Sequence, residues 1–188
     1  MWKFISIRYL IIFLLFISPV KANEEQKFFD LLKTNDKILW LRHFSSPGNG
    51  DPDNFDVRVR STQRNIGKFG IKQGKAYSKL FKKNKVKIKH ALSSQWFRAM
   101  ETCQFFGEFK TFSALNSTFS SQFSHNTAKQ RRQLREYIKK WNGDGNLLLC
   151  AHYVILGEHL DYGANEGEMI LTDKNLNILA KYRLKIKN

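Results

Sequence analysis

The chain has 188 residues, 42% of them hydrophobic, and its 32 Lys and Arg against 16 Asp and Glu give a formal net charge of +16. This length fits one domain with a sizeable core and is short for two. A basic surface attracts anions, but no recognised nucleic-acid motif accompanies the charge, so we expect no nucleic-acid partner. The charge forms either a solvated surface or a field that attracts phosphorylated substrates or gives peripheral attraction to an anionic membrane surface.

The first 22 residues have the layout of a secretory signal peptide. Lys3 and Arg8 supply positive charge, an apolar run follows at residues 9–17, and Ala22 is a small residue at a cleavage position. The run is shorter than the ~20 apolar residues that span a bilayer, and an uncleaved anchor is the alternative. We therefore expect residues 1–22 to be removed, one domain over residues 23–188, and a periplasmic or other extracytoplasmic location.

The rest of the chain alternates between helical and strand-like patterns. In chain order, the helical patterns lie at residues 24–32, 67–81, 94–102, 127–141 and 154–160. The strand patterns lie at residues 37–41, 86–92, 147–151, 169–172 and 176–183. Strands that alternate with helices and have continuously apolar cores favour an α/β fold, a three-layer sandwich in which helices cover both faces of a mainly parallel sheet.

Cys103 and Cys150 are the only cysteines, too few for a disulfide framework. Each has apolar neighbours, so we expect two buried free thiols, with one disulfide as the alternative. Neither cysteine has the spacing with histidines that a zinc site requires. We expect no metal site.

Basic and imidazole side chains follow three of the predicted strands. Arg42 and His43 come directly after the first strand, Arg98 lies in the helix after the second, and His152 follows the strand at residues 147–151. Ligands of parallel α/β sheets bind beyond the carboxyl ends of the strands. These four side chains are therefore expected to lie together at one edge of the sheet.

This set of side chains suits phosphoryl transfer, which requires an in-line nucleophile and fixed positive charge around the equatorial oxygens. His43 is the candidate nucleophile, provided that an acceptor such as a carbonyl holds its other ring nitrogen as the donor. Arg42 and Arg98 offer forked donors that match phosphate oxygens. His152, if protonated beside the dianion, adds a donor where charge develops in the transition state.

The same residues belong to an ordered set of motifs. The set comprises Leu41-Arg42-His43-Phe44, residues 47–52, residues 62–66, Gly70, residues 93–102, residues 115–117, Ala151-His152 and Gly167-Glu168. Over about residues 38–171 the chain resembles the histidine phosphatase superfamily, the phosphoglycerate mutase-like group, and is most similar to the small exported bacterial members of its first branch. The resemblance implies a phosphoglycerate mutase-like fold and a phosphohistidine on His43.

The resemblance also implies a phosphate pocket and the absence of any metal or organic cofactor. The pocket would consist of Arg42, Arg98 and His152. Arg64 and Asn49 are candidates for further substrate-binding residues, and surface roles are the alternative for both. Glu101 is expected to have a structural role on its helix rather than that of an acid.

The chain departs from the family pattern at three places. Val59-Arg60 stands where relatives often have Asp-Cys, and Tyr153 follows His152 where they often have Gln. The segment at residues 115–119 contains no glutamate at the place where mutases of the family have their acid. The proton donor is therefore unassigned, with Glu168 and Asp51 as candidates; a good leaving group, or water, would need no dedicated acid.

Three functions compete at this point. The leading hypothesis is a monomeric phosphomonoester hydrolase that acts on a small phosphorylated substrate: phosphosugars, lipopolysaccharide-linked phosphates and small phosphoesters all fit. A second enzyme would act on phosphohistidine proteins, but those partners are cytoplasmic and the leader argues against it. A third interpretation is a catalytically silent phosphate-binding or envelope-interaction protein that retains the fold.

Overall fold

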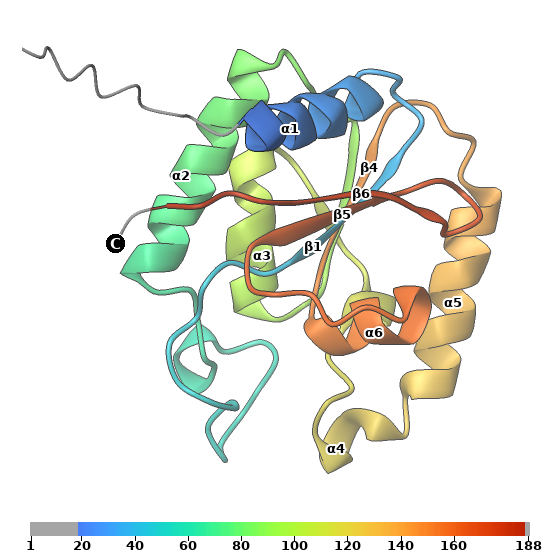
Figure 1. Cartoon of the computed structure of the whole chain (residues 1–188). Helices are drawn as coiled ribbons and strands as arrows, with labels where there is room; N and C mark the ends of the chain where they lie inside the picture. The colour runs from blue at the N-terminus through green and yellow to red at the C-terminus, as the bar shows by residue number, and fades with distance from the viewer. Residues whose placement is uncertain (1–18, 187–188) are drawn as a thin grey trace, which may run out of the picture.

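A single mixed sheet organises the computed structural model, which describes residues 19–186, with side chains from residue 24 onward. The six strands have the order β3-β2-β4-β1-β5-β6, and Figure 1 labels β1, β4, β5 and β6 among them. Their bounds are β1 Ile38–Arg42, β2 His90–Ser93, β3 Lys110–Thr111, β4 Leu147–Ala151, β5 Glu168–Thr172 and β6 Ile178–Arg183. The strands β3, β2, β4 and β1 are mutually parallel, and β5 and β6 run antiparallel to their neighbours. The predicted mainly parallel α/β sheet is confirmed.

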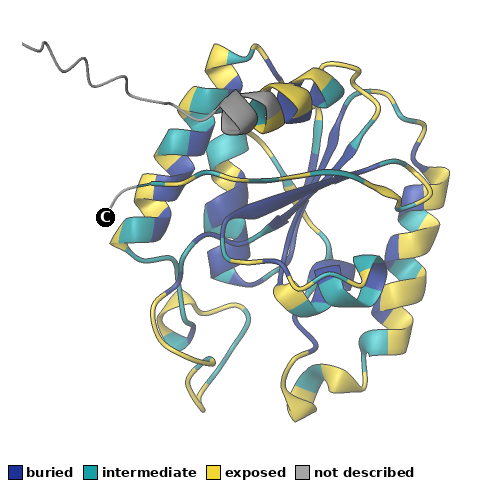
Figure 2. Ribbon diagram, in the orientation of Figure 1, coloured by how far each residue is buried: buried dark blue, intermediate teal, exposed yellow. Residues whose placement is uncertain are grey.

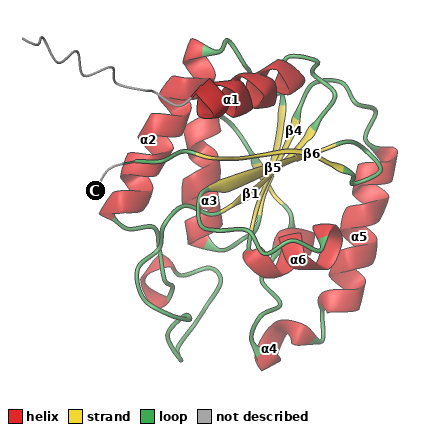
Figure 3. Cartoon of the chain, viewed as in Figure 1, coloured by secondary structure: helices red, strands yellow, loops and turns green. Residues whose placement is uncertain are grey.

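Helices cover both faces of this sheet (Figure 3). The α-helices are α1 Pro19–Leu32, α2 Lys68–Lys83, α3 Phe97–Cys103, α4 Ser121–Ser124, α5 Thr127–Lys140 and α6 Tyr153–Leu160. Within residues 19–186, three short 3₁₀ helices lie at Arg60–Thr62, Gln104–Phe106 and Ser113–Leu115. Residues of α1, α2 and α3 pack in one core, and residues of α5 and α6 pack in the other.

The alternation of side chains along β1 explains why the sheet has two cores. Leu39 and Leu41 point into the core beneath α1 and α2, whereas Ile38 and Trp40 point into the core beneath α5 and α6. All four side chains are fully buried, and the central strands are buried along their length (Figure 2). A strand buried on both faces reads as a continuous apolar run, which is the pattern that predicted β1 and β4.

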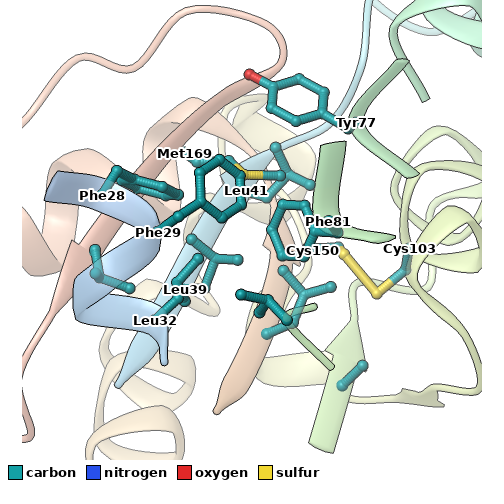
Figure 4. Packing of buried hydrophobic residues seen from close by; sticks show 14 of the residues in the cluster. Phe28, Phe29, Leu32, Leu39, Leu41, Tyr77, Phe81, Cys103, Cys150 and Met169 are labelled. Atoms are coloured by element: carbon teal, nitrogen blue, oxygen red, sulfur yellow. A yellow bond between two sulfur atoms is a disulfide. The ribbon is translucent and has the colours of Figure 1, made fainter. Parts of the chain in front are cut away.

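The two cysteines form a disulfide, so the expectation of two free thiols is wrong. Cys103 at the end of α3 meets Cys150 of β4 in the first core (Figure 4), and their Cα atoms lie 5.8 Å apart, within the range of ~4.4–6.8 Å that a disulfide spans. Apolar neighbours correctly indicated burial, but only the packing of α3 across β4 brings the two sulfur atoms together. The bridge ties the helix that carries Arg98 to the strand that precedes His152.

Several element bounds differ from the sequence expectation. The strand predicted from residue 86 begins only at His90, because the ladder with β4 starts at the pair His90–Leu147. Residues 113–124, for which the sequence patterns predicted neither helix nor strand, contain a 3₁₀ helix and the short α4. Of the predicted leader, residues 1–18 lie outside the described residues and the remainder lies in α1. No helix within residues 19–186 is both long enough and apolar enough to cross a membrane.

Candidate active site

The ends of β1, β2 and β4 meet at one edge of the sheet, as the strand-end argument predicted. The backbone ladder continues past the strands: His43 N donates to the Ala151 carbonyl at 3.0 Å, and Ser94 N donates to the Cys150 carbonyl at 3.0 Å. This register places the imidazole rings of His43 and His152 with their centroids 5.5 Å apart. Two imidazoles at this spacing can contact one tetrahedral anion.

His43 has the protonation state that a nucleophilic imidazole needs. Its side chain is 2% exposed, and Nδ1 lies 2.9 Å from the Phe44 carbonyl. Because a carbonyl only accepts hydrogen bonds, Nδ1 carries the proton and Nε2 keeps its lone pair. Burial lowers the pKa of His43 well below the ordinary 6.5, and nearby positive charges lower it further although the Phe44 carbonyl opposes them. Those charges belong to Arg98, Arg42 and Arg64.

Hydrogen bonds through Ser94, the residue after the neighbouring strand β2, hold the ring of His152 in place. Its Nε2 lies 2.9 Å from Ser94 Oγ, and Ser94 Oγ donates to Asn116 Oδ1 at 3.2 Å. Since the hydroxyl proton is directed at Asn116, the imidazole donates to the hydroxyl oxygen. Burial, followed by the charge of Arg98, lowers the pKa of His152 well below 6.5. The ring is therefore neutral in the protein on its own, and a neighbouring dianion favours its protonated form.

The guanidinium groups of Arg42, Arg64 and Arg98 are each anchored by hydrogen bonds that leave other donors free. Arg42 Nη1 donates to the Ala164 carbonyl at 2.9 Å, and Arg64 Nη1 donates to the Ser46 carbonyl. In all three arginines Nε is buried and has no hydrogen-bond partner among the described residues. Buried donors without partners are costly, and an anion with several acceptor oxygens satisfies them. Arg64, predicted only from the resemblance, lies with the other two.

Asp51 anchors this arginine cluster and is not placed as an acid. It accepts hydrogen bonds from Arg98 Nη1 at 2.7 Å, from Trp96 Nε1 at 3.0 Å and from the backbone N–H of Arg64 at 2.9 Å. Burial raises the pKa of Asp51, but these hydrogen bonds outweigh burial and the pKa lies below its ordinary value. The carboxylate is therefore ionised and fixes the orientation of Arg98.

Two predicted residues lie apart from the cluster. Glu168 accepts hydrogen bonds from Tyr162 Oη at 2.7 Å and from the backbone and side-chain N–H groups of Asn165 at 2.8 and 3.0 Å. Burial raises the pKa of Glu168, but the hydrogen bonds bring it below its ordinary value, an ionised state that does not suit a proton donor. Asn49 is exposed in the loop after β1, and no hydrogen bond joins it to the cluster within the described part of the chain.

Glu101 has the structural role expected of it. It accepts hydrogen bonds from Arg60 Nε at 2.6 Å and from the backbone N–H of Ile66 at 3.1 Å, and Arg60 Nη2 forms an ion pair with it at 2.6 Å. The unusual Arg60 thereby ties the segment before α2, which carries Arg64, to helix α3.

Sequence reasoning missed Glu166. Its Oε1 lies 3.5 Å from Arg64 Nη1 and 3.8 Å from Arg42 Nη2. The neighbouring Gly167 has a φ of 72°, and its N–H reaches the carbonyls of Arg42 and His43 at 3.2 and 3.1 Å. A glycine turn ahead of a strand was the available signal that this loop returns to the same sheet edge.

No group of three or more His, Cys, Asp or Glu side chains able to hold a metal ion occurs within residues 19–186. The functional groups at the sheet edge are the two imidazoles and the three guanidinium groups.

We compared this architecture with known proteins. No family model matches the sequence, and no curated protein matches it. Among solved structures, the protein histidine phosphatase SixA in complex with tungstate matches with a TM-score of 0.55 at 14% identity, over 78% of this chain and 96% of SixA. The chain has the histidine phosphatase fold.

Two further solved structures are similar to this chain. The protein TTHB049 from Thermus thermophilus matches with a TM-score of 0.56 at 12% identity, over 79% of this chain and 99% of TTHB049. A SixA from Agrobacterium tumefaciens matches with a TM-score of 0.55 at 13% identity, over 80% of this chain and 99% of that chain. At such identities the likeness establishes the histidine phosphatase fold, and the chemistry is argued from the residues at the sheet edge.

Proposed function

We propose that this protein is a phosphomonoester hydrolase that forms a phosphohistidine on His43. One observation carries the proposal: a buried imidazole, neutral and with Nδ1 fixed to the Phe44 carbonyl, is surrounded by three guanidinium groups. A neutral nucleophile inside a positive pocket is the combination that transfer of a dianionic phosphoryl group requires.

In the first step Nε2 of His43 attacks phosphorus. The N–P bond forms as the bond from phosphorus to the ester oxygen breaks, and that oxygen leaves with the electron pair and takes a proton from water. In the second step a water molecule attacks phosphorus and the N–P bond breaks. Inorganic phosphate is released, the proton of the attacking water goes to solvent or to phosphate, and the imidazole returns to its starting state.

The surrounding residues stabilise the charge of the transferring group. The free N–H groups of Arg42, Arg64 and Arg98 can bind its equatorial oxygens. His152, neutral in the protein alone, gains a proton more readily beside the dianion and then adds a donor. The anchors of the arginines, among them Asp51, hold these donors in place before the substrate arrives.

Turnover measurements on the purified full-length chain test the proposal. Phosphate release from a panel of small phosphomonoesters should be abolished in His43→Ala and retained in His125→Ala, which removes an exposed histidine. Tight phosphate binding without turnover of any ester would instead identify a silent phosphate-binding protein. The panel also includes a phosphohistidine peptide, because the structurally similar SixA is a protein histidine phosphatase.

We further infer that the protein is exported, on the pattern of residues 1–22. The Cys103–Cys150 disulfide supports this inference because structural disulfides persist in oxidising compartments. Cell fractionation should find the protein outside the cytoplasm with its N-terminus at Asn23. Cytoplasmic protein that still carries residues 1–22 would contradict export.

A further inference from the structure

Two aromatic side chains are exposed beside the arginine cluster. Phe119, in the loop before α4, is 66% exposed, the largest value among the large hydrophobic side chains of the described residues. Tyr153, the first residue of α6, is 37% exposed, and its ring centroid lies 5.5 Å from that of Phe119. The guanidinium carbon of Arg42 lies 5.3 Å from the Tyr153 ring. The aromatic pair is therefore continuous with the phosphate pocket.

The loop that carries Phe119 is anchored. Thr118 Oγ1 donates to Glu158 Oε1 at 2.8 Å, and the backbone N–H of Phe119 reaches Ser117 Oγ at 3.4 Å. Ser117 and Thr118 are only 8% and 6% exposed. The exposure of Phe119 is thus a fixed feature of a packed loop, and apolar surface held in water next to a polar site is typical of ligand binding.

A hollow of about 480 Å³ lies against the two rings. Its remaining wall includes Val154, Gly157 and Glu158 of α6. Its volume falls in the range of ~300–1,000 Å³ that small-molecule sites occupy. Glu158 Oε2 is a buried acceptor without a hydrogen-bond partner among the described residues. The wall therefore combines apolar surface with one unsatisfied acceptor.

We propose that Phe119 and Tyr153 hold the leaving group of the substrate and that this group is an aromatic ring, so that the protein prefers aryl phosphomonoesters. The inference rests on the proposed hydrolase function and names its substrate class. Flat rings pack on exposed aromatic side chains better than alkyl groups do, through offset and edge-to-face contacts. A hydroxyl or N–H on the ring would also satisfy Glu158.

The states of the two candidate proton donors support the same substrate class. Asp51 and Glu168, the two acids that the sequence offered as proton donors, are both ionised and held by hydrogen bonds. A phenol ionises near pH ~10, far more readily than an alcohol, so a phenolate can leave without a dedicated acid. The P–O bond to the ring then breaks, and the phenolate oxygen leaves with the electron pair and takes a proton from water.

Binding and turnover of matched ligands test the inference on the full-length chain. Wild type should hydrolyse phenyl phosphate with a higher kcat/KM than ethyl phosphate and bind phenylphosphonate, which it cannot hydrolyse, more tightly than methylphosphonate. Phe119→Ala should weaken phenylphosphonate binding about two- to tenfold and affect methylphosphonate much less. Phe119→Trp should restore binding, and Ile71→Ala, which removes another exposed apolar side chain, should behave like wild type.

Equal binding of the two phosphonates by wild type, or equal losses for both in Phe119→Ala, would overturn the inference. Hydrolysis of ethyl phosphate with no aryl preference would overturn it as well, while the proposed hydrolase function would stand. Failure to hydrolyse any ester would contradict the hydrolase itself. The outcomes therefore separate an error in the substrate class from an error in the reaction.

Discussion

The floor and the mouth of the proposed active site are built in different ways. The floor consists of His43, His152 and Arg98, which are 2%, 2% and 5% exposed. His43 and His152 directly follow the paired strands β1 and β4, and Arg98 lies in α3, the helix after β2. The mouth consists of Phe119 and Tyr153, which are 66% and 37% exposed and lie in a loop and at the start of a helix. The sheet thus fixes the groups that meet the phosphoryl group, whereas loops decide which ester reaches them. Variants of the two regions should differ accordingly.

Removal of the disulfide beneath the floor should have the largest effect, a loss of stability. Cys103→Ser with Cys150→Ser removes a bridge that closes a sequence separation of 47 residues, and a loop of this length corresponds to about 4 kcal/mol of unfolding free energy. Urea unfolding without reductant measures the loss. The Phe119→Ala variant, changed only at the mouth, should unfold like wild type. Equal stability of the cysteine double variant and wild type would show that the bridge does not support the floor.

Arg98→Ala should have the next largest effect, a loss of turnover. Removing one donor to a developing anion typically lowers turnover about 100- to 1,000-fold, and Arg98 is nearly buried and aimed by Asp51. Arg98→Lys keeps the charge without the forked donor and should lie between Arg98→Ala and wild type. Arg58→Ala, whose side chain is 83% exposed and paired with Asp56, is the matched control. Near-normal kcat/KM in Arg98→Ala would remove Arg98 from the floor.

Lower pH should reduce the free energy of unfolding through the two buried histidines of the floor. Burial lowers the pKa of His43 and of His152 well below 6.5, so on acidification the unfolded chain binds these protons while the folded protein does not. The free energy of unfolding should therefore be undiminished above pH 6.5 and fall below it, by up to about 1.4 kcal/mol per pH unit for each histidine.

Urea unfolding at several pH values measures this slope. His43→Gln should show a smaller slope than wild type, because one of the two buried histidines is gone. His125→Gln, changed at an exposed position, should keep the wild-type slope. If His43→Gln and wild type lose stability in parallel, burial does not depress the pKa of His43.

Glu166→Gln should give the smallest effect, at the border between floor and mouth. Its carboxylate lies near Arg64 and Arg42 and competes with phosphate for both. Neutralising it should tighten the binding of inorganic phosphate about two- to fivefold, as measured by calorimetry. Glu136→Gln, on the exposed surface of α5, should change nothing. Weaker phosphate binding in Glu166→Gln would mean that Glu166 positions the arginines instead.

The sequence predicted the floor because short-range patterns determine it. The apolar run at residues 147–151 is β4 itself, and a strand whose end is known delivers the next residue to a known edge of the sheet. His43 and His152 were placed together by this reasoning alone. The fold followed from the same alternation of buried strands and amphipathic helices.

The sequence did not predict features that depend on contacts between distant segments. The disulfide requires α3 to lie across β4, and the approach of Glu166 to Arg64 depends on the turn at Gly167. The exposure of Phe119 also has no local signal, because the residue follows a buried Thr118 anchored to α6. Loop geometry of this kind is set by the assembled structure, and so the mouth could not be predicted.

Trapping of the covalent intermediate tests the central claim most directly. The full-length chain is mixed with a ³²P-labelled phosphomonoester and quenched in alkaline denaturant, in which phosphohistidine is stable, and the labelled residue is mapped by mass spectrometry. We predict label on His43, retained in His125→Ala and absent from His43→Ala. Turnover without labelled histidine, or label on another residue, would contradict the assignment of His43 as the nucleophile.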